Sequence, residues 1–279
     1  VPWQMVAEKT GARVRAFTLE EDGAFSMNRF KAELSDRTRI IAVPHVSNVL
    51  GTVFPIADIA AIARDRDALI VVDGCQGVVH MPVDVTALGA DFYVFSAHKL
   101  YGPNGVGVLW GRAEILADMP PFLGGGDMID RVTIEKSTYA EPPVRFEAGT
   151  PAIAETIALG AAVDYVESIG MEAVRAHEQQ VLSYAHQRLS AVEGLKLIGT
   201  AAGKSGVVSF TMDCAHPHDI STIIDHDGVA IRAGHHCAQP LMDHLDLPST
   251  ARASVGLYTK PEEFDALATS LEKVRRIFG

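Results

Sequence analysis

The sequence predicts an α/β fold with a mainly parallel sheet in a large first domain, followed by a smaller α+β domain. Short apolar runs bounded by turn residues are typical of buried strands, and they occur at 39–45, 68–73, 91–96 and 105–110. An amphipathic helical pattern at 56–65 separates the first two runs. Strands that alternate with helices form layered, mostly parallel sheets.

The other elements of the first domain are expected around this sheet. A helical pattern at 1–9 starts without an initiator methionine, so we expect that the chain is entered in mid-domain. The segment 12–19 is expected to form a strand, and Ser26 to cap a helix over 26–34. A hairpin is expected at 132–139.

Thr150 and Pro151 are expected to open a further helix, with Thr150 as its N-cap and Pro151 at its first position. Because helix N-termini bind phosphate, Thr150 either contacts a phosphate group or acts only as a cap.

The smaller domain is expected to begin near Gly170, which divides the chain into residues 1–169 and 170–279. A long charged helix over 171–192 leads into it. Its further elements are a strand at 206–210 and helices at 218–227 and 262–277.

Composition excludes several classes of partner. The net charge of -11 argues against nucleic acid and anionic membranes. No apolar run approaches the length of a membrane span, and no signal-peptide pattern is present. Three scattered cysteines are too few for a disulfide framework, which favours a reducing cytoplasm. We therefore expect a globular cytoplasmic protein with a small-molecule ligand.

Polar side chains that suit pyridoxal phosphate (PLP) follow two of the predicted strands. Asp73 ends one apolar run, and Ser96, His98 and Lys99 end the next. Ligands of such sheets bind beyond the carboxyl ends of the strands. PLP requires a lysine for a Schiff base and an acidic partner for its pyridine nitrogen. The alternative is that Asp73 caps a helix and Lys99 is a solvated surface residue.

Cys237 marks a second reactive centre, directly after His235 and His236. Three interpretations remain open. A free cysteine is commonly a small buried hydrophobe. Histidine and cysteine also bind zinc. The spacing does not favour a metal site, because three adjacent residues cannot easily surround one ion. The third is a nucleophile on a short loop, with a thiolate stabilised by cations such as Arg232.

Arg252 is an isolated arginine in a stretch of apolar and small residues that is typical of a strand. Because an unpaired buried arginine is costly, it requires an anion. That anion is either a substrate carboxylate, which arginine binds bidentately, or the carboxylate of a structural salt bridge.

Four motifs stand out together, at 95–103, 124–129, 146–151 and 232–238. Their order and spacing resemble those of group II cysteine desulfurases of the SufS type, in the class V aminotransferase family. The similarity runs from Val1 to Gly279. It implies the architecture of fold type I PLP-dependent transferases, PLP as cofactor, L-cysteine as substrate and a homodimer.

The resemblance also assigns roles to individual residues. The catalytic residues are then Lys99, Cys237 and His98, and Cys237 receives the sulfur of cysteine as a persulfide while alanine is released. The cofactor is then held by Lys99, Asp73, Gln76, Ser96 and His98, and by Thr150, which reaches the cofactor of the partner subunit. The substrate carboxylate is then held by Asn48 and Arg252.

The implied function is a cysteine desulfurase that supplies sulfur for iron–sulfur cluster assembly through a SufU- or SufE-like acceptor protein. His216 and His218 stand at the spacing seen in enzymes that use a SufU-like zinc protein, so His218 either takes over the partner's zinc or belongs to a surface cap. A selenocysteine lyase is one alternative. A non-catalytic partner-binding module, if the chain does not hold PLP, is the other.

Two departures from the family pattern bear on the site. The family's N-terminal segment, with a histidine that stacks on the cofactor ring and a phosphate-binding residue, is not among these residues. Cys75 stands where the family usually has an alanine packed against the ring. Its thiol is either a harmless core group or a second reactive sulfur.

Overall fold

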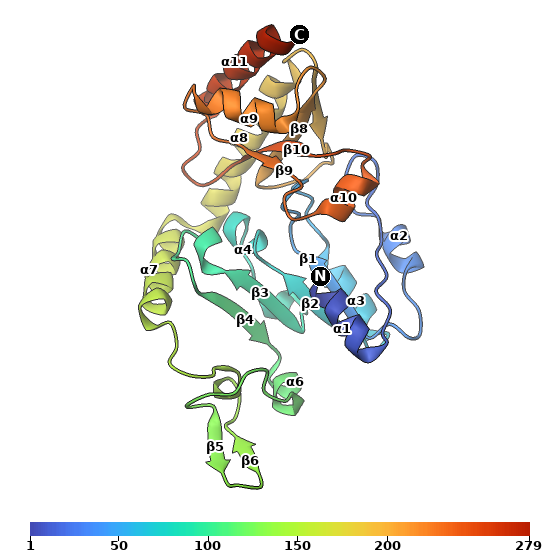
Figure 1. Cartoon of the computed structure of the whole chain (residues 1–279), viewed down its shortest axis with the longest axis vertical. Coiled ribbons are helices and arrows are strands. Elements are labelled where there is room, and N and C mark those ends of the chain that lie inside the picture. The colour runs from blue at the N-terminus through green and yellow to red at the C-terminus, as the bar shows by residue number, and fades with distance from the viewer. The chain divides into compact units, whose positions relative to one another are not determined.

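A computed structural model describes all residues from Val1 to Gly279, which form two compact units (Figure 1). The parallel-sheet unit consists of Arg39–Ser47 and Phe54–Gln180. The antiparallel-sheet unit consists of Val1–Thr38, Asn48–Val53 and Val181–Gly279. Each is described by itself, and the expected domain boundary near Gly170 stays a prediction.

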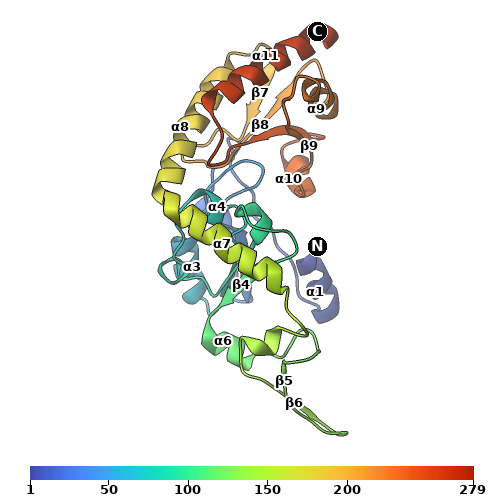
Figure 2. The same cartoon turned by 90° about the vertical axis from the view of Figure 1, so that its left-hand side faces the viewer.

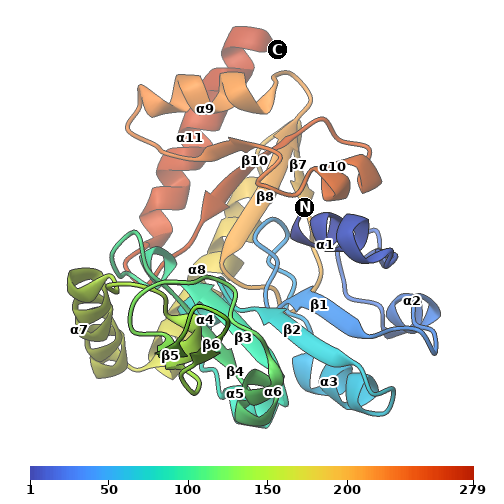
Figure 3. The same ribbon diagram turned by 60° about the horizontal axis from the view of Figure 1, so that its bottom comes forward.

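The parallel-sheet unit is built on a sheet with the strand order β1-β2-β3-β4 (Figure 3). Its first three strands are β1 (Ile40–Pro44), β2 (Leu69–Asp73) and β3 (Phe92–Ser96), and they run parallel. Asp73 lies between Pro44 of β1 and Val94 of β3 in the register. This arrangement confirms the α/β fold with a mainly parallel sheet.

The fourth strand, β4 (Gly107–Gly111), runs antiparallel to β3. A parallel neighbour requires a crossover of about a dozen residues, usually helical. The connection here holds only the short 3₁₀ helix η1 (Ala97–Lys99), so the chain turns back beside β3.

Short helices connect the parallel strands. They are α3 (Ile56–Arg64), α4 (Gly77–His80) and α5 (Val85–Leu88). The apolar side of α3 is formed by residues of which four are buried and Ile62 is half-buried, and this helix packs on β2; the buried residues are Ile56, Ile59, Ala60 and Ala63. Asp84 caps α5 by accepting hydrogen bonds from two backbone amides, and Gly89 ends the helix in the left-handed conformation.

The rest of the parallel-sheet unit follows β4. It comprises α6 (Ala113–Asp118), β5 (Ile129–Val132), β6 (Ser137–Tyr139), η2 (Val144–Phe146), α7 (Ile153–Ile169) and the first half of α8 (Met171–Ser190). The expected hairpin is formed by β5 and β6, and it extends away from the sheet in Figures 1 and 2.

The antiparallel-sheet unit has the strand order β7-β8-β10-β9. Its strands are β7 (Leu195–Ile198), β8 (Val207–Met212), β9 (Arg232–Gly234) and β10 (Thr250–Ser254). Its helices are α1 (Pro2–Thr10), α2 (Met27–Ala32), the second half of α8, α9 (Pro217–Asp225), α10 (Gln239–His244) and α11 (Pro261–Phe278). One apolar core joins β8 and β10 to α8, α9 and α11.

Two expectations about local structure are wrong. The segment 12–19 forms no strand. Its apolar residue Phe17 instead packs edge-on against Phe25 and Phe30, with ring centroids 5.7 and 5.5 Å apart, so it is stabilised without a partner strand.

Thr150 does not cap α7. The helix begins at Ile153, and the first helical hydrogen bond runs from the Thr156 amide to the Ala152 carbonyl, which makes Ala152 the N-cap. Pro151 therefore lies before the helix and not at its first position. None of the helices combines the length and hydrophobicity that crossing a lipid bilayer requires.

Candidate active site

Asp73 is the last residue of β2, and the chain turns sharply after it. The Cys75 amide donates to Asp73 Oδ1 at 2.9 Å, and the Gly74 amide donates to the Val94 carbonyl of β3. The turn therefore fixes an exposed carboxylate at the carboxyl edge of the sheet.

Ser96, His98 and Lys99 lie at the same edge, because they end β3 and form η1. The amides of Leu100 and Gly102 both donate to the Ala97 carbonyl, which closes the chain into a tight turn. Lys99 and Ser96 are half-buried, whereas His98 is exposed.

The side chain of Cys75 lies under the influence of residues from both strand ends. Its thiol lies 3.9 Å from Ser96 Oγ. Burial raises the pKa of the Cys75 thiol, the Asp73 carboxylate raises it further, and the Lys99 charge opposes the shift. The charges of Asp73 and Lys99 thus both act on one half-buried side chain.

A buried tyrosine packs against the turn after Asp73. Tyr93 is 1% exposed, and its hydroxyl lies 2.9 Å from His45 Nδ1. A Cβ atom placed on Gly74 would lie 1.9 Å from the Tyr93 ring, so only glycine allows the backbone to approach this ring. Neither Tyr93 nor His45 was singled out from the sequence, since a buried aromatic pair has no pattern of its own.

Gln76 follows the same turn as the residue before α4. It is half-buried, and its Oε1 lies 3.2 Å from His80 Nε2. Thr150 is exposed in the loop before α7. The acid, amine, hydroxyl and amide at the ends of β2 and β3 are the groups that the ring, its nitrogen and the phosphate of PLP require, so the residues present fit this cofactor.

A separate thiol site lies in the antiparallel-sheet unit. Cys237 is exposed on the loop after β9, and Arg232 Nη2 donates to its Sγ at 3.7 Å. Both His236 and Cys237 have positive φ angles, 54° and 62°, which residues other than glycine rarely adopt. Such strain persists only where the surroundings impose it, and it is commonly found at functional sites.

His236 anchors this loop. It is 1% exposed, and its Nε2 lies 2.9 Å from Thr250 Oγ1 and 3.1 Å from the Thr250 carbonyl. Burial lowers the pKa of His236 to about 4, and the positive charge of Arg252 contributes, so the ring is neutral at pH 7. From the sequence this residue was only part of a motif, and its anchoring role was missed.

Arg252 and Asn48 meet in the same unit. Arg252 Nη1 donates to the Asn48 carbonyl at 2.7 Å, and Asn48 Nδ2 donates to the His236 carbonyl at 2.7 Å. Arg252 Nε is buried without a hydrogen-bond partner. Burial lowers the pKa of Arg252, and the charge of Arg232 adds to the effect.

Arg252 also lies directly opposite Arg232 in the pairing of β10 with β9. Like charges at such positions repel each other. With a free buried donor on Arg252, this pair is suited to an anion that approaches from outside the protein.

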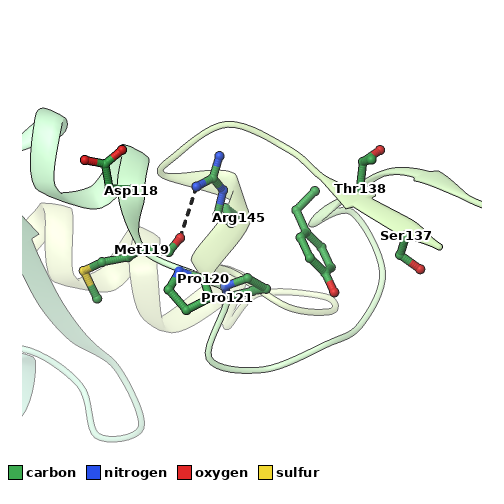
Figure 4. Close-up of a pocket in the computed structure, with 8 residues that line it drawn as sticks. Asp118, Met119, Pro120, Pro121, Ser137, Thr138 and Arg145 are labelled. Carbon is green, nitrogen blue, oxygen red and sulfur yellow. Dashed lines mark hydrogen bonds between the residues drawn. The ribbon is translucent and has the colours of Figure 1, made fainter.

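The pocket drawn in Figure 4 is unrelated to these residues. It has a volume of about 420 Å³ and is lined by Asp118, Met119, Pro120, Pro121, Ser137, Thr138, Tyr139 and Arg145. None of them is a predicted site residue, and the Arg145 guanidinium is already bonded to the carbonyls of Ala117, Met119 and Ala140.

Comparison with known proteins gives consistent matches. The family model described as aminotransferase class-V matches residues 1–267. A probable cysteine desulfurase of Streptomyces coelicolor is 47% identical over 281 residues, which cover 100% of this chain and 67% of that protein. A relative from Halalkalibacterium halodurans with the same description is 48% identical, with coverage of 100% and 68%.

Solved structures agree. The cysteine desulfurase CsdA of Escherichia coli superposes with a TM-score of 0.94 at 34% identity, covering 100% of this chain and 69% of that one. A variant of C-DES with glycine covalently linked to its PLP cofactor has a TM-score of 0.85 at 25% identity, covering 99% and 71%. The chain spans about two thirds of the length of these relatives.

Proposed function

This chain belongs to the class V aminotransferase family and, within it, to the cysteine desulfurases, and we propose that it converts L-cysteine to L-alanine with a persulfide on Cys237. The observation that supports this most is the convergence of Asp73 and Lys99 on the half-buried Cys75 side chain. An acid and an amine at one edge of a parallel sheet are the groups that PLP chemistry requires.

The residues that hold PLP in this proposal come from the ends of β2 and β3. Lys99 binds it covalently through its amine, Asp73 pairs with the pyridine nitrogen, and Gln76 contacts the phenolic oxygen. The phosphate contacts are assigned to Ser96 and His98, and Thr150 is assigned to the cofactor of the partner subunit. When bound, PLP supplies an electron sink for the bonds at the substrate Cα.

The substrate carboxylate is assigned to Arg252 and Asn48. The buried, unpartnered Nε of Arg252 supports this assignment, because a carboxylate would satisfy it. It would also relieve the repulsion between Arg252 and Arg232.

Cys237 is the proposed nucleophile. Its thiolate attacks the sulfur of the bound cysteine, so that a sulfur–sulfur bond forms on the enzyme and the carbon–sulfur bond breaks. The electron pair stays with the carbon skeleton, which takes up a proton, and Lys99 is the group that moves protons there. The Arg232 guanidinium lies 3.7 Å from the Cys237 Sγ, so a positive charge stands beside the attacking sulfur.

We further assign the protein to the cytoplasm, as a homodimer that passes sulfur to a SufU- or SufE-like acceptor for iron–sulfur cluster assembly. His218 supports an acceptor with bound zinc. It is exposed and stacks on His216, with ring centroids 5.4 Å apart, while the His216 ring contacts the His218 amide and Ser249. If His218→Ala leaves stimulation by a zinc-containing acceptor unchanged, this assignment is wrong.

The central test is borohydride reduction of the purified protein followed by mass spectrometry. We expect a pyridoxyl group on Lys99 and no other lysine, together with stoichiometric alanine from cysteine. Selenocysteine, assayed in parallel, separates a desulfurase from a selenocysteine lyase. A folded protein without a pyridoxylated lysine would instead favour a non-catalytic partner-binding module.

A further inference from the structure

A line of three side chains runs from the proposed cofactor site into the interior of the parallel-sheet unit. His80 ends α4, is 4% exposed, and its Nδ1 lies 2.7 Å from Oε2 of Glu178 on α8. On its other side, His80 Nε2 lies 3.2 Å from Gln76 Oε1. Figure 2 shows α4 beside this part of α8. Glu178, His80 and Gln76 therefore form one hydrogen-bonded line.

The chemistry of the end groups fixes the protons on His80. A carboxylate oxygen and an amide carbonyl oxygen both accept hydrogen bonds, so the imidazole donates from both nitrogens. The two acceptors are Glu178 Oε2 beside Nδ1 and Gln76 Oε1 beside Nε2. The Gln76 carbonyl oxygen makes this contact, which leaves the NH₂ group of Gln76 available to donate to another acceptor.

The burial of Glu178 distinguishes this pair from an ordinary structural salt bridge. Glu178 is 1% exposed, and its second oxygen, Oε1, is buried without a hydrogen-bond partner. Buried ion pairs contribute little net stability, and a half-satisfied carboxylate contributes less. A role other than stability accounts better for a buried acid with a single partner.

We propose that Glu178 and His80 are positioning residues, which hold Gln76 with its NH₂ group directed at the phenolic oxygen of PLP. The inference rests on the proposed function, since it takes Gln76 as a ligand of that oxygen. A donor at this point stabilises the oxygen as a phenolate. If the amide were reversed, its carbonyl oxygen would face the phenolate and repel it.

The test uses the isosteric variant Glu178→Gln, which keeps the packing and removes the charge. In the wild-type protein loaded with PLP, histidine-selective ¹⁵N NMR is expected to show protons on both nitrogens of His80. In Glu178→Gln one of these protons is lost. The amide of Gln76 then reverses, the visible absorption band of the bound cofactor shifts, and the Kd for PLP rises about tenfold.

Val174→Ala is the matched control. Val174 is 2% exposed on the same helix and carries no hydrogen-bonding side-chain group, so its truncation lowers the Tm without removing a charge or a hydrogen bond. It is expected to leave the absorption band and the His80 signals unchanged.

A single proton on wild-type His80, or an unchanged absorption band in Glu178→Gln, overturns the inference while the proposed function stands. Failure of the wild-type protein to bind PLP at Lys99 overturns both. The NMR measurement on the wild-type protein needs no variant, so a folding defect in Glu178→Gln does not remove the test.

Discussion

Two cysteines lie near the proposed chemistry, and they differ in the features that control thiol reactivity. Cys237 is exposed, has a positive φ angle, and accepts a hydrogen bond from Arg232. Cys75 is half-buried, and burial together with Asp73 raises the pKa of its thiol. Since the thiolate is the nucleophile, the structure favours the harmless interpretation of Cys75 over a second reactive sulfur.

We therefore expect opposite results from two conservative substitutions. Cys237→Ser lowers alanine formation from cysteine by at least about 10²-fold, because the sulfur acceptor is lost, while the absorption band of bound PLP is retained. Cys75→Ala keeps activity within about twofold of the wild type. Equal losses in both variants would contradict the assignment of Cys237.

Arg252 is expected to act on substrate binding. Arg252→Lys keeps the charge but loses the planar pair of donors, so the KM for cysteine rises about tenfold, and Arg252→Ala raises it about a hundredfold. Arg188→Lys is the control, since Arg188 pairs with Asp265 on the surface of the same unit. An unchanged KM in Arg252→Ala would show that the carboxylate binds elsewhere.

His236 makes the stability of the protein depend on pH. The pKa of His236 is about 4 in the folded state and 6.5 in an unfolded chain. Between these values the unfolded state binds more protons, so the contribution is complete above pH 6.5 and is lost as the pH falls towards 4. We expect the free energy of unfolding, measured with urea, to fall less between pH 7 and pH 5 in His236→Gln than in the wild type. The difference is on the order of 1–2 kcal/mol. An equal decrease in the wild type and in His236→Gln would contradict a neutral, buried His236.

At the scale of elements, the sequence was most informative where a local pattern determines structure. The apolar runs before Asp73 and before Lys99 predicted β2 and β3, and the Ser26 cap predicted α2, whose Arg29 amide bonds to the Ser26 hydroxyl. The predicted roles of the side chains at these strand ends stay proposals, but their placement at one edge follows from parallel pairing.

Other elements depend on contacts that a local pattern does not contain. The segment 12–19 has the alternation of a strand, yet Phe17 packs into an aromatic cluster instead. The strand β7 was missed because it contains only four residues, Leu195–Ile198, and is defined by its pairing with β8. The links from Asn48 to His236 and from His80 to Glu178 span 188 and 98 residues, so no spacing rule predicts them.

The close approach of Gly74 to Tyr93 gives a prediction at this scale. Gly74→Ala places a methyl group 1.9 Å from the buried ring, so we expect a loss of about 1–3 kcal/mol in the free energy of unfolding and weaker PLP binding. Gly160→Ala is the control, because this glycine lies within α7 with no atom near the added methyl group. It should stabilise the protein by about 0.5–1 kcal/mol. Urea unfolding measures both.

The whole molecule divides the proposed machinery between two compact units. The parallel-sheet unit holds Asp73 and Lys99, and the antiparallel-sheet unit holds Cys237 and Arg252. The segment Asn48–Val53 belongs to the latter, although strands of the other unit flank it in sequence. Ser209 Oγ donates to the Val49 carbonyl, and Thr52 Oγ1 donates to the Gly23 carbonyl, both at 2.6 Å, which explains this membership.

Because the proposed PLP ligands lie in one unit, cofactor binding should stabilise the two units unequally. A ligand at a hundred times its Kd stabilises the state that binds it by about 2.7 kcal/mol. Hydrogen exchange with PLP is therefore expected to slow at the amides of β2, β3 and η1 and to leave β8 and β10 unchanged. Lys99→Ala abolishes the effect, because the covalent attachment is lost. Equal slowing of hydrogen exchange in both units would show that they unfold together. The prediction that PLP stabilises them unequally would then be wrong.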